Sequence, residues 1–239
     1  MRKFAAKGIH LFYPILAGAN LRDRAIACLG ALVGIALTVL LCTSLPLDTA
    51  AYPLLFGPVG ASAVLVFAVP ASPMAQPWSV IGGNMISALV GVAAAHSIGN
   101  PELAAGVAVA GAILAMSLLH CLHPPGGAVA LTAVIGSPAI LAMGYDFALA
   151  PVGLNSVMLL TAGWLFHRFS GHSYPHRPVL AVGAETIRPG LHHDDIRRAL
   201  ADMGETFDVD PDDLDLLLQR AEQHAIDRGA IISSGPTEP

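Results

Sequence analysis

The stretch "LHCLHPPGGAVALTAVIGSP", residues 119–138, interrupts a chain that is otherwise almost continuously apolar. It sets two histidines, two adjacent prolines and two adjacent glycines between hydrophobic segments. Proline cannot continue a helix, because it lacks a backbone N–H and its ring clashes with the preceding turn. The stretch therefore predicts a break inside the hydrophobic region, followed by a short helix that starts near Gly127.

The distribution of charge around this break excludes a soluble fold. The chain has 239 residues, of which 12% are charged, whereas a soluble domain carries about 25%. No Lys or Arg occurs between Ala25 and His167. The acidic residues of that region are Asp48, Glu102 and Asp146. A soluble surface cannot be built without charge, so residues 25–168 are predicted to form an all-α integral membrane domain.

Six apolar segments are expected in this domain, and they predict a helical bundle of four to six membrane segments. Their ranges are 25–45, 54–70, 79–98, 103–121, 126–143 and 149–168. A helix needs about 20 apolar residues to cross a bilayer, and the second and fifth segments are short or follow Gly/Pro breaks. Such breaks are tolerated at membrane depth only where protein or a water-filled cavity covers the freed backbone groups.

The basic residues predict the orientation. Both flanks of the membrane domain are basic and its internal loops lack Lys and Arg, so both termini should be cytoplasmic. An even number of crossings follows. Six spans, or four spans with two re-entrant segments, satisfy it equally.

Two polar regions flank the membrane domain. Residues 1–24 form a basic cytoplasmic segment, in which residues 9–19 are expected to lie along the interface. Residues 169–239 form a cytoplasmic polar tail, which supplies the net charge of -5 and gives no indication of nucleic-acid binding. Two short amphipathic helices are predicted in it, one capped by Asp194 or Asp195 and one opened by Pro211.

The two broken segments resemble each other. "PVGASAVLVFAV" starts at Pro58 and "PGGAVALTAVIG" at Pro125, and one constant offset also pairs Gly60 with Gly127. This indicates an internal repeat of three plus three segments, inverted in the membrane, although segments rich in small residues also match by chance. Substrate sites of such folds lie where discontinuous helices meet near the midplane.

The helix starts predict an anion site. The first turn of a helix has unpaired N–H groups and a partial positive charge, and glycines let an anion approach the backbone. Two converging starts would bind a small anion without Lys or Arg. The candidate binding residues are Gly57, Pro58, Gly60, Ala61, Ser62, Asn84, His120, His123, Pro124, Pro125, Gly126 and Gly127. Alternatively, His123 caps a turn and Asn84 joins helices as structural glue.

Other chemistries have weaker signals, and no metal or cofactor is expected. Cys121 points away from His120 and His123 on a helix, and a fourth ligand is absent nearby in sequence. Motifs of hydrolases, zinc proteases and phosphate loops are missing. Ser62 could act as the nucleophile of an intramembrane enzyme only with a histidine partner, and its Gly60-Ala61-Ser62-Ala63 context does not fit the serine motif of rhomboid-like proteases.

These motifs together resemble one family. "GPVGASAVLVFA", "SPMAQPWSVIGGN" and "LHPPGGAVALTAVIG" are similar to the HPP family of integral membrane proteins, and His123-Pro124-Pro125 is its eponymous motif. The resemblance extends from residue 15 through "SGHSYPHRP". It implies four membrane spans and, from plastid and cyanobacterial members, nitrite transport. The tail resembles the linker that precedes paired CBS domains in bacterial members.

The sequence thus predicts a multi-pass transporter of the bacterial inner membrane for a small monovalent anion, with nitrite implied by the resemblance. The alternative is a structural or sensory membrane module that signals through its cytosolic tail, and an intramembrane enzyme ranks third. The expected partners are a small inorganic anion and the lipid bilayer, without nucleic acid, and a homo-oligomer is left open.

Overall fold

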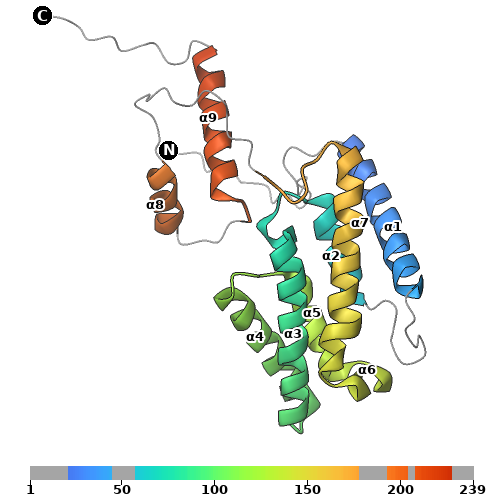
Figure 1. Ribbon diagram of the computed structural model, residues 1–239. Coiled ribbons are helices and arrows are strands. Elements are labelled where there is room, and N and C mark those ends of the chain that lie inside the picture. Colours follow the sequence, from blue (N-terminus) through green and yellow to red (C-terminus); the bar gives the residue numbers. More distant parts are fainter. Residues whose placement is uncertain (1–20, 45–56, 178–192, 204–207, 228–239) are drawn as a thin grey trace, which may run out of the picture.

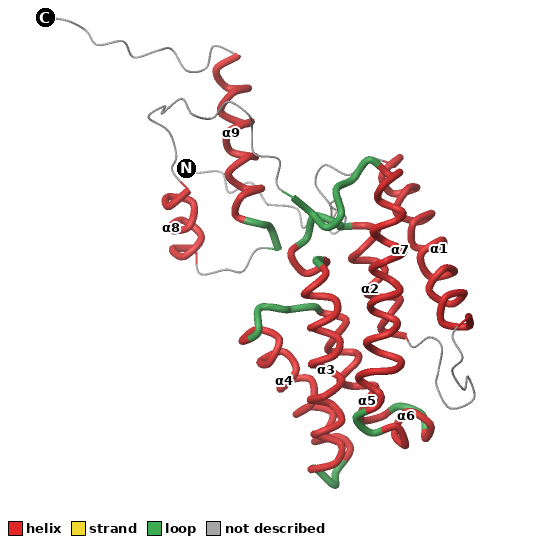
Figure 2. Tube along the Cα trace, viewed as in Figure 1, coloured by secondary structure: helices red, strands yellow, loops and turns green. Residues whose placement is uncertain are grey.

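The computed structural model describes residues 21–44, 57–177, 193–203 and 208–227, and these parts of the chain contain helices and no strand (Figure 2). The predicted segment 9–19 lies outside them. The elements of the membrane domain are α1 (Leu21–Ser44), α2 (Gly57–Ala68), η1 (Pro73–Ala75), α3 (Pro77–Ser97), α4 (Pro101–Leu118), α5 (Pro124–Ile135), α6 (Pro138–Met143), η2 (Ala148–Gly153) and α7 (Leu154–Ser170). The tail contains α8 (His193–Met203) and α9 (Pro211–Asp227).

Four helical stretches of the described residues are long and apolar enough to cross a membrane. They are α1, α3, α4 and the continuous stretch Ala148–Ser170 that joins η2 to α7. The all-α membrane class predicted from the sequence is therefore confirmed. The second and fifth segments are short apolar helices instead, as their Gly/Pro breaks indicated.

The two short helices have the same length and the same place in the two halves. Both α2 and α5 have 12 residues, and their starts at Gly57 and Pro124 have the same offset as the sequence alignment of the two halves. A serine–proline pair follows each one, and Ser72 and Ser137 both cap the next turn with the side-chain oxygen. These matches support the predicted repeat.

The predicted starts of both short helices and the extent of one apolar segment were wrong. The short helices begin three residues before Gly60 and Gly127, because proline is well tolerated in a first turn, where its missing N–H costs nothing. The segment 126–143 is not one helix: α5 ends at Ile135, and α6 begins at Pro138. Pro138 disfavours the helical conformation of the residue before it, and Ser137 is extended, with ψ 157°.

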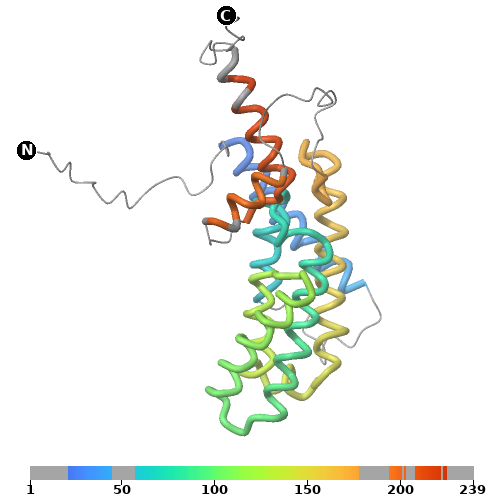
Figure 3. Tube along the Cα trace, turned by 90° about the vertical axis from the view of Figure 1, so that its left-hand side faces the viewer, coloured from blue at the N-terminus to red at the C-terminus, as the bar shows by residue number. Residues whose placement is uncertain are grey.

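The long helices place both ends of the membrane domain on the same side of the bundle (Figure 1). α1 begins and α7 ends at the upper end of the view, whereas the α3–α4 connection and α6 lie at the lower end. α2 and α5 begin inside the bundle and run toward opposite ends, α2 toward the start of α3 and α5 toward α6. α8 and α9 lie beside the end where α1 begins (Figure 3). The tail thus contains two short helices as predicted, and Pro211 opens the second. The predicted cap of the first was wrong, because α8 begins at His193 and Asp194 and Asp195 lie inside its first turn.

Glycines bring α3 and α5 into close contact. A Cβ atom on Gly83 would lie 2.5 Å from the His123 Cβ, and one on Gly91 would lie 2.5 Å from the Ala130 carbonyl oxygen. On the other helix, a Cβ on Gly126 would lie 3.0 Å from the Gly83 carbonyl oxygen. Small residues let membrane helices approach in this way. The contact fixes the start of α5 against the first half of α3.

Candidate functional site

His123 lies at the meeting point of the two halves of the membrane domain. It is fully buried, with a relative exposure of 0%, and it occupies the N-cap of α5 without capping that helix through its side chain. Its Nε2 is 2.8 Å from the Ser62 Oγ of α2, and its Nδ1 is 2.8 Å from the Met74 carbonyl oxygen of η1. The ring therefore connects α5 to the two elements of the first half that surround it.

The carbonyl partner fixes the direction of these hydrogen bonds. A carbonyl oxygen only accepts, so we assign the proton to His123 Nδ1, which donates to Met74. In the neutral ring Nε2 is then an acceptor, and the Ser62 hydroxyl donates to it. A neutral ring also suits the surroundings, because α2, α3 and α5 contain no carboxylate to balance a buried cation.

Asn84 of α3 extends this arrangement to α7. Its Nδ2 is 3.3 Å from Ser62 Oγ and 3.1 Å from Ser156 Oγ, and it donates to both hydroxyl oxygens. The five residues Ser62, Met74, Asn84, His123 and Ser156 are called the polar relay below. Its donors run in one direction, from Asn84 through Ser62 and His123 to the Met74 carbonyl.

One polar atom of the relay has no partner in the described part of the protein. Asn84 Oδ1 is buried and accepts no hydrogen bond, although the Asn84 side chain is only 3% exposed. Buried acceptors are nearly always paired, and leaving one unpaired costs about 1–3 kcal/mol. The atom therefore marks a place where a further donor belongs.

The predicted site residues separate into two groups. Ser62, Asn84 and His123 meet in the relay, and Pro58, Pro125 and Gly126 are buried beside them in their helices. The exposed members of the set are Gly57, Gly60, Ala61, His120 and Pro124, whereas Gly127 is half-buried. A Cβ atom on Gly57 or Gly60 would meet nothing within 4 Å, and one on Gly127 would come no closer than 3.9 Å to Val109.

The start of α5 offers fewer free donors than the anion site required. Pro124 and Pro125 have no N–H, and the Gly126 N–H, the first in the helix, donates to the His123 carbonyl oxygen at 2.8 Å. Neighbouring atoms also occupy the space beside Gly126, since a Cβ there would lie 2.5 Å from Ser87 Oγ. The anion site at the backbone therefore stays a prediction, and the polar contacts that the structure shows beside this helix start come from side chains.

His120 belongs to the end of α4 and not to the relay. It has a positive φ of 52°, its N–H donates to the Ser117 carbonyl, and the Cys121 N–H donates to the Met116 carbonyl. This pair of bonds is a Schellman motif, which ends helices with one residue in the left-handed conformation. The exposed His120 side chain therefore occupies the position that glycine usually takes.

Sequence reasoning missed two members of the relay. The carbonyl of Met74 carries no sequence signal, because any residue in that turn would supply it. Ser156 lies next to Asn155 in the chain, and only the helical register of α7 turns the serine toward Asn84. Asn155 itself lies outside the relay, donating to the Pro151 carbonyl at 2.6 Å and contacting Cys42 of α1 at 4.0 Å.

Ser62 and His123 also have the spacing of a nucleophile and its base. The structure thus supplies the histidine partner that an intramembrane enzyme would need. However, both side chains are almost completely buried, with exposures of 1% and 0%, and Ser62 additionally accepts from Asn84. The pair can polarise and position a small molecule, whereas a bulky substrate has no path to the serine oxygen in this conformation.

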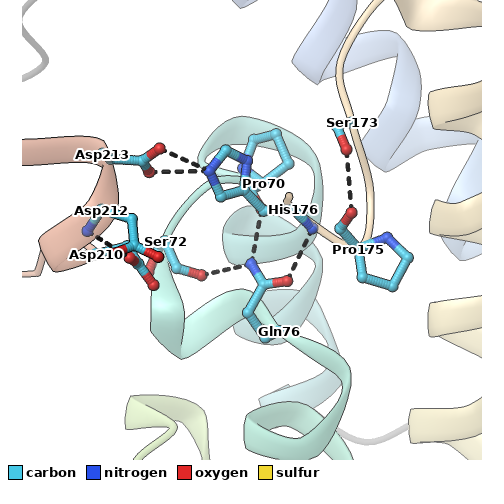
Figure 4. A network of polar contacts seen from close by, with 9 residues as sticks. All are labelled: Pro70, Ser72, Gln76, Ser173, Pro175, His176, Asp210, Asp212 and Asp213. Carbon is cyan, nitrogen blue, oxygen red and sulfur yellow. Dashed lines mark hydrogen bonds and ion pairs between the residues drawn. The ribbon is translucent and has the colours of Figure 1, made fainter. Parts of the chain in front are cut away.

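A second polar network joins the tail to the turn that holds His123 (Figure 4). Gln76 donates to the carbonyls of Pro70 and Ser72 and accepts from the His176 N–H at 2.9 Å. The His176 ring lies 2.9 Å from the carboxylate of Asp213, at the start of α9. The figure shows α9, the turn around residues 70–76 and the segment after α7 converging on Gln76.

Two further contacts tighten this turn. The Ser72 hydroxyl donates to the Asp208 carboxylate at 2.9 Å, and the Tyr174 hydroxyl donates to the Ala75 carbonyl at 2.7 Å. Burial raises the pKa of Tyr174, so its hydroxyl remains a donor. The turn that offers Met74 to His123 is thus held by the tail from outside.

Comparison with known proteins bears on the membrane domain. The family model described as "HPP, transmembrane region" matches residues 17–175. The chain belongs to the HPP family. Two transmembrane proteins of Dictyostelium discoideum are similar to it, one 38% identical over 126 residues, or 51% of this chain and 44% of that protein. The other is 36% identical over 120 residues, or 48% of this chain and 38% of that protein.

The HPP chain described here spans less than half the length of either relative. The relatives are described only as transmembrane proteins, in agreement with a membrane protein built from several apolar helices. No solved structure matches the chain.

Proposed function

We propose that this HPP protein transports a small monovalent anion across the membrane, and that the substrate is nitrite. The observation that carries the proposal is the pair of short helices, α2 and α5, which begin inside the bundle and meet through the hydrogen bond between Ser62 and His123. Transporters place substrates where discontinuous helices meet. A chain that only anchored a tail would have no need of polar side chains at this depth.

The relay would orient the substrate from side chains and helix dipoles. The starts of α2 and α5 each carry about half a positive charge, which favours an electronegative substrate oxygen near Ser62 and His123 without any Lys or Arg. The Ser62, Asn84 and Ser156 side chains offer short polar contacts from three different helices. Small relative movements of those helices would make and break the contacts during a transport cycle.

Uptake into proteoliposomes tests the proposal. Purified protein should raise nitrite uptake above that of protein-free liposomes, and a Ser62→Ala variant should lower the protein-dependent rate at least tenfold, because it removes the hydroxyl that joins α2 to α5. Ala61→Ser is the matched control, since Ala61 neighbours Ser62 but is exposed. Uptake equal to that of empty liposomes for every small anion tried would contradict the proposal.

A second candidate function, signalling through the tail, is favoured by the contacts of the turn at residues 70–76. Asp208 and Asp213 of the tail hold Ser72 and His176, and the same turn presents Met74 to His123. Movement of α9 could thus change the position of the turn. The tail would report on the membrane domain or regulate it.

Limited trypsin digestion tests this connection. Asp213→Asn removes the charge that pairs with His176, so we expect faster cleavage at Arg220 of α9, and Asp215→Asn on the same helix serves as the control. If the contact also couples to the membrane domain, Asp213→Asn changes nitrite uptake. Unchanged digestion and unchanged uptake together would contradict the signalling role.

A further inference from the structure

The unpaired oxygen of Asn84 restricts the chemistry of any group that could bind beside it. Asn84 Oδ1 is the buried side-chain atom of the described residues that has no hydrogen-bond partner. It belongs to the side chain that also contacts Ser62 and Ser156, close to the N-cap of α5. Because the amide is almost completely buried, bulk water does not satisfy this acceptor.

The orientation of the amide follows from the rest of the relay. The Met74 carbonyl forces His123 Nδ1 to donate, so Ser62 gives its single proton to Nε2. Ser62 Oγ then needs a donor on its other side, and only the Asn84 Nδ2 supplies one. If the oxygen and nitrogen of Asn84 were exchanged, the amide oxygen would face Ser62 Oγ, and both atoms would be acceptors. The unpaired atom is therefore an acceptor and not a donor.

An acceptor selects a ligand with a proton to give. A bare anion has none and would be repelled by the amide oxygen. A cationic donor would need a carboxylate nearby, but α2, α3 and α5 contain no Asp or Glu, and the only charged residue of α7 is Arg168 near its end. The titratable groups of these elements are His123 at the far end of the relay and, in last turns, His96 and His167.

We infer that the relay binds its substrate as a neutral weak acid, whose hydroxyl donates to Asn84 Oδ1. The inference rests on the proposed transport function and specifies its substrate class. One anion and one proton combine in the adjacent aqueous phase, the uncharged acid occupies the site, and it dissociates after release on the other side. Each turnover moves an anion together with a proton, so transport is electrically neutral. A strong-acid anion of similar size cannot take this route.

Three anions in proteoliposomes separate the alternatives. Nitrite and formate are anions of weak acids, whereas nitrate is the anion of a strong acid and stays charged near neutral pH. We expect protein-dependent uptake of nitrite and formate, one proton entering per anion as measured with a trapped pH dye, and no protein-dependent uptake of nitrate. A membrane potential of either sign, set with potassium and valinomycin, should leave the rates unchanged. Leakage through protein-free liposomes is subtracted at each pH.

Substitution of Asn84 tests the atom itself. Asn84→Leu keeps the approximate size without the acceptor and should lower nitrite uptake at least tenfold. Ser87→Ala, one turn later on α3 and bonded only to the Met116 sulfur at 3.4 Å, should retain uptake. If Asn84→Leu does not insert correctly, the inference is tested by the wild-type protein alone, through the effect of the membrane potential on uptake and the number of protons that enter per anion.

The outcomes distinguish this inference from the function on which it rests. Nitrite uptake that follows the membrane potential without proton entry, or nitrate uptake at an equal rate, would overturn the neutral-acid site and leave transport intact. Full uptake by Asn84→Leu would show that Oδ1 holds only a structural water. Absence of protein-dependent uptake for all three anions would remove the transport function itself.

Discussion

At the scale of single residues, His123 joins three elements through the hydrogen bonds of its two ring nitrogens. Its Nδ1 satisfies the Met74 carbonyl and its Nε2 accepts from Ser62, so the side chain ties α5 to both η1 and α2. The sequence identified His123 as a site residue from its place in the break. Its actual partners came from segments 49 and 61 residues away along the chain, which no local pattern could reveal.

Replacing His123 separates hydrogen bonding from titration. Glutamine can donate to Met74 and accept from Ser62, so His123→Gln should keep most nitrite uptake and, if the substrate itself carries the proton, the wild-type pH profile. His123→Leu leaves both partners unpaired in the interior, which costs about 1–3 kcal/mol for each buried group. Thermal unfolding in detergent should show a lower Tm for His123→Leu than for His123→Gln. A flattened pH profile in His123→Gln would assign the proton to the histidine instead.

His120 gives a contrasting case on the same segment. His120 has a left-handed conformation at the end of α4, which glycine adopts without strain. His120→Gly should therefore leave the free energy of unfolding unchanged or raise it by up to about 1 kcal/mol. Nitrite uptake should be unaffected, since the exposed side chain lies outside the relay. Uptake and Tm of the variant are measured beside those of the wild type. Loss of uptake at unchanged Tm would show that the imidazole gates the pathway.

At the scale of elements, the contact between α3 and α5 decides where the relay forms. Gly83 lies directly against His123 and the Cys121 carbonyl, and Asn84 is its neighbour in the chain. Any side chain at this position would block the observed approach of the two helices. The glycines that matter are therefore those between helices, whereas Gly60 borders open space.

Two alanine substitutions test this distinction. A Cβ on Gly83 would come within 2.7 Å of the Cys121 carbonyl oxygen, so Gly83→Ala must separate the helices, at a cost of about 1–3 kcal/mol. Gly60→Ala adds the same methyl group where nothing lies within 4 Å and should be neutral or stabilising. Tm in detergent and nitrite uptake check both variants. Equal stability of the two would contradict the close α3–α5 contact.

At the scale of the whole molecule, the ends of the membrane domain share one side with the tail. α1 begins and α7 ends at this end of the bundle, and α8 and α9 lie beside it (Figures 1 and 3). The basic residues Arg22, Arg24 and Arg168 belong to the same two helix ends. Because basic residues stay on the cytoplasmic side, we expect this end to face the cytoplasm.

Cysteine labelling in cells tests the orientation. In a variant without Cys28, Cys42 and Cys121, a membrane-impermeant maleimide should label Gly99→Cys, in the exposed turn between α3 and α4. The same reagent should not label Ser173→Cys, which lies after α7, until the membrane is permeabilised. The reverse pattern would invert the topology, and labelling of both from outside would contradict a membrane domain of this depth.

The sequence by itself determined the elements of this protein. The absence of Lys and Arg between Ala25 and His167 identified a membrane domain, and Gly/Pro breaks located two short helices of equal length. These features are local, because hydropathy and proline geometry act within a few residues. The predicted boundaries were wrong at α2 and α5, because proline in the first turn lets both helices begin before Gly60 and Gly127.

Only the tertiary structure decided which polar groups meet. It brought the side chains of Ser62, Asn84 and His123 together. The backbone anion site expected at Gly60 and Gly127 stays a prediction, to which Pro124 and Pro125 have no N–H to offer. The tertiary structure also added Ser156 and the Met74 carbonyl, and it left Asn84 Oδ1 without a donor. Hydrogen bonds of this kind join residues far apart in sequence, and their existence depends on helix register and approach that only packing fixes.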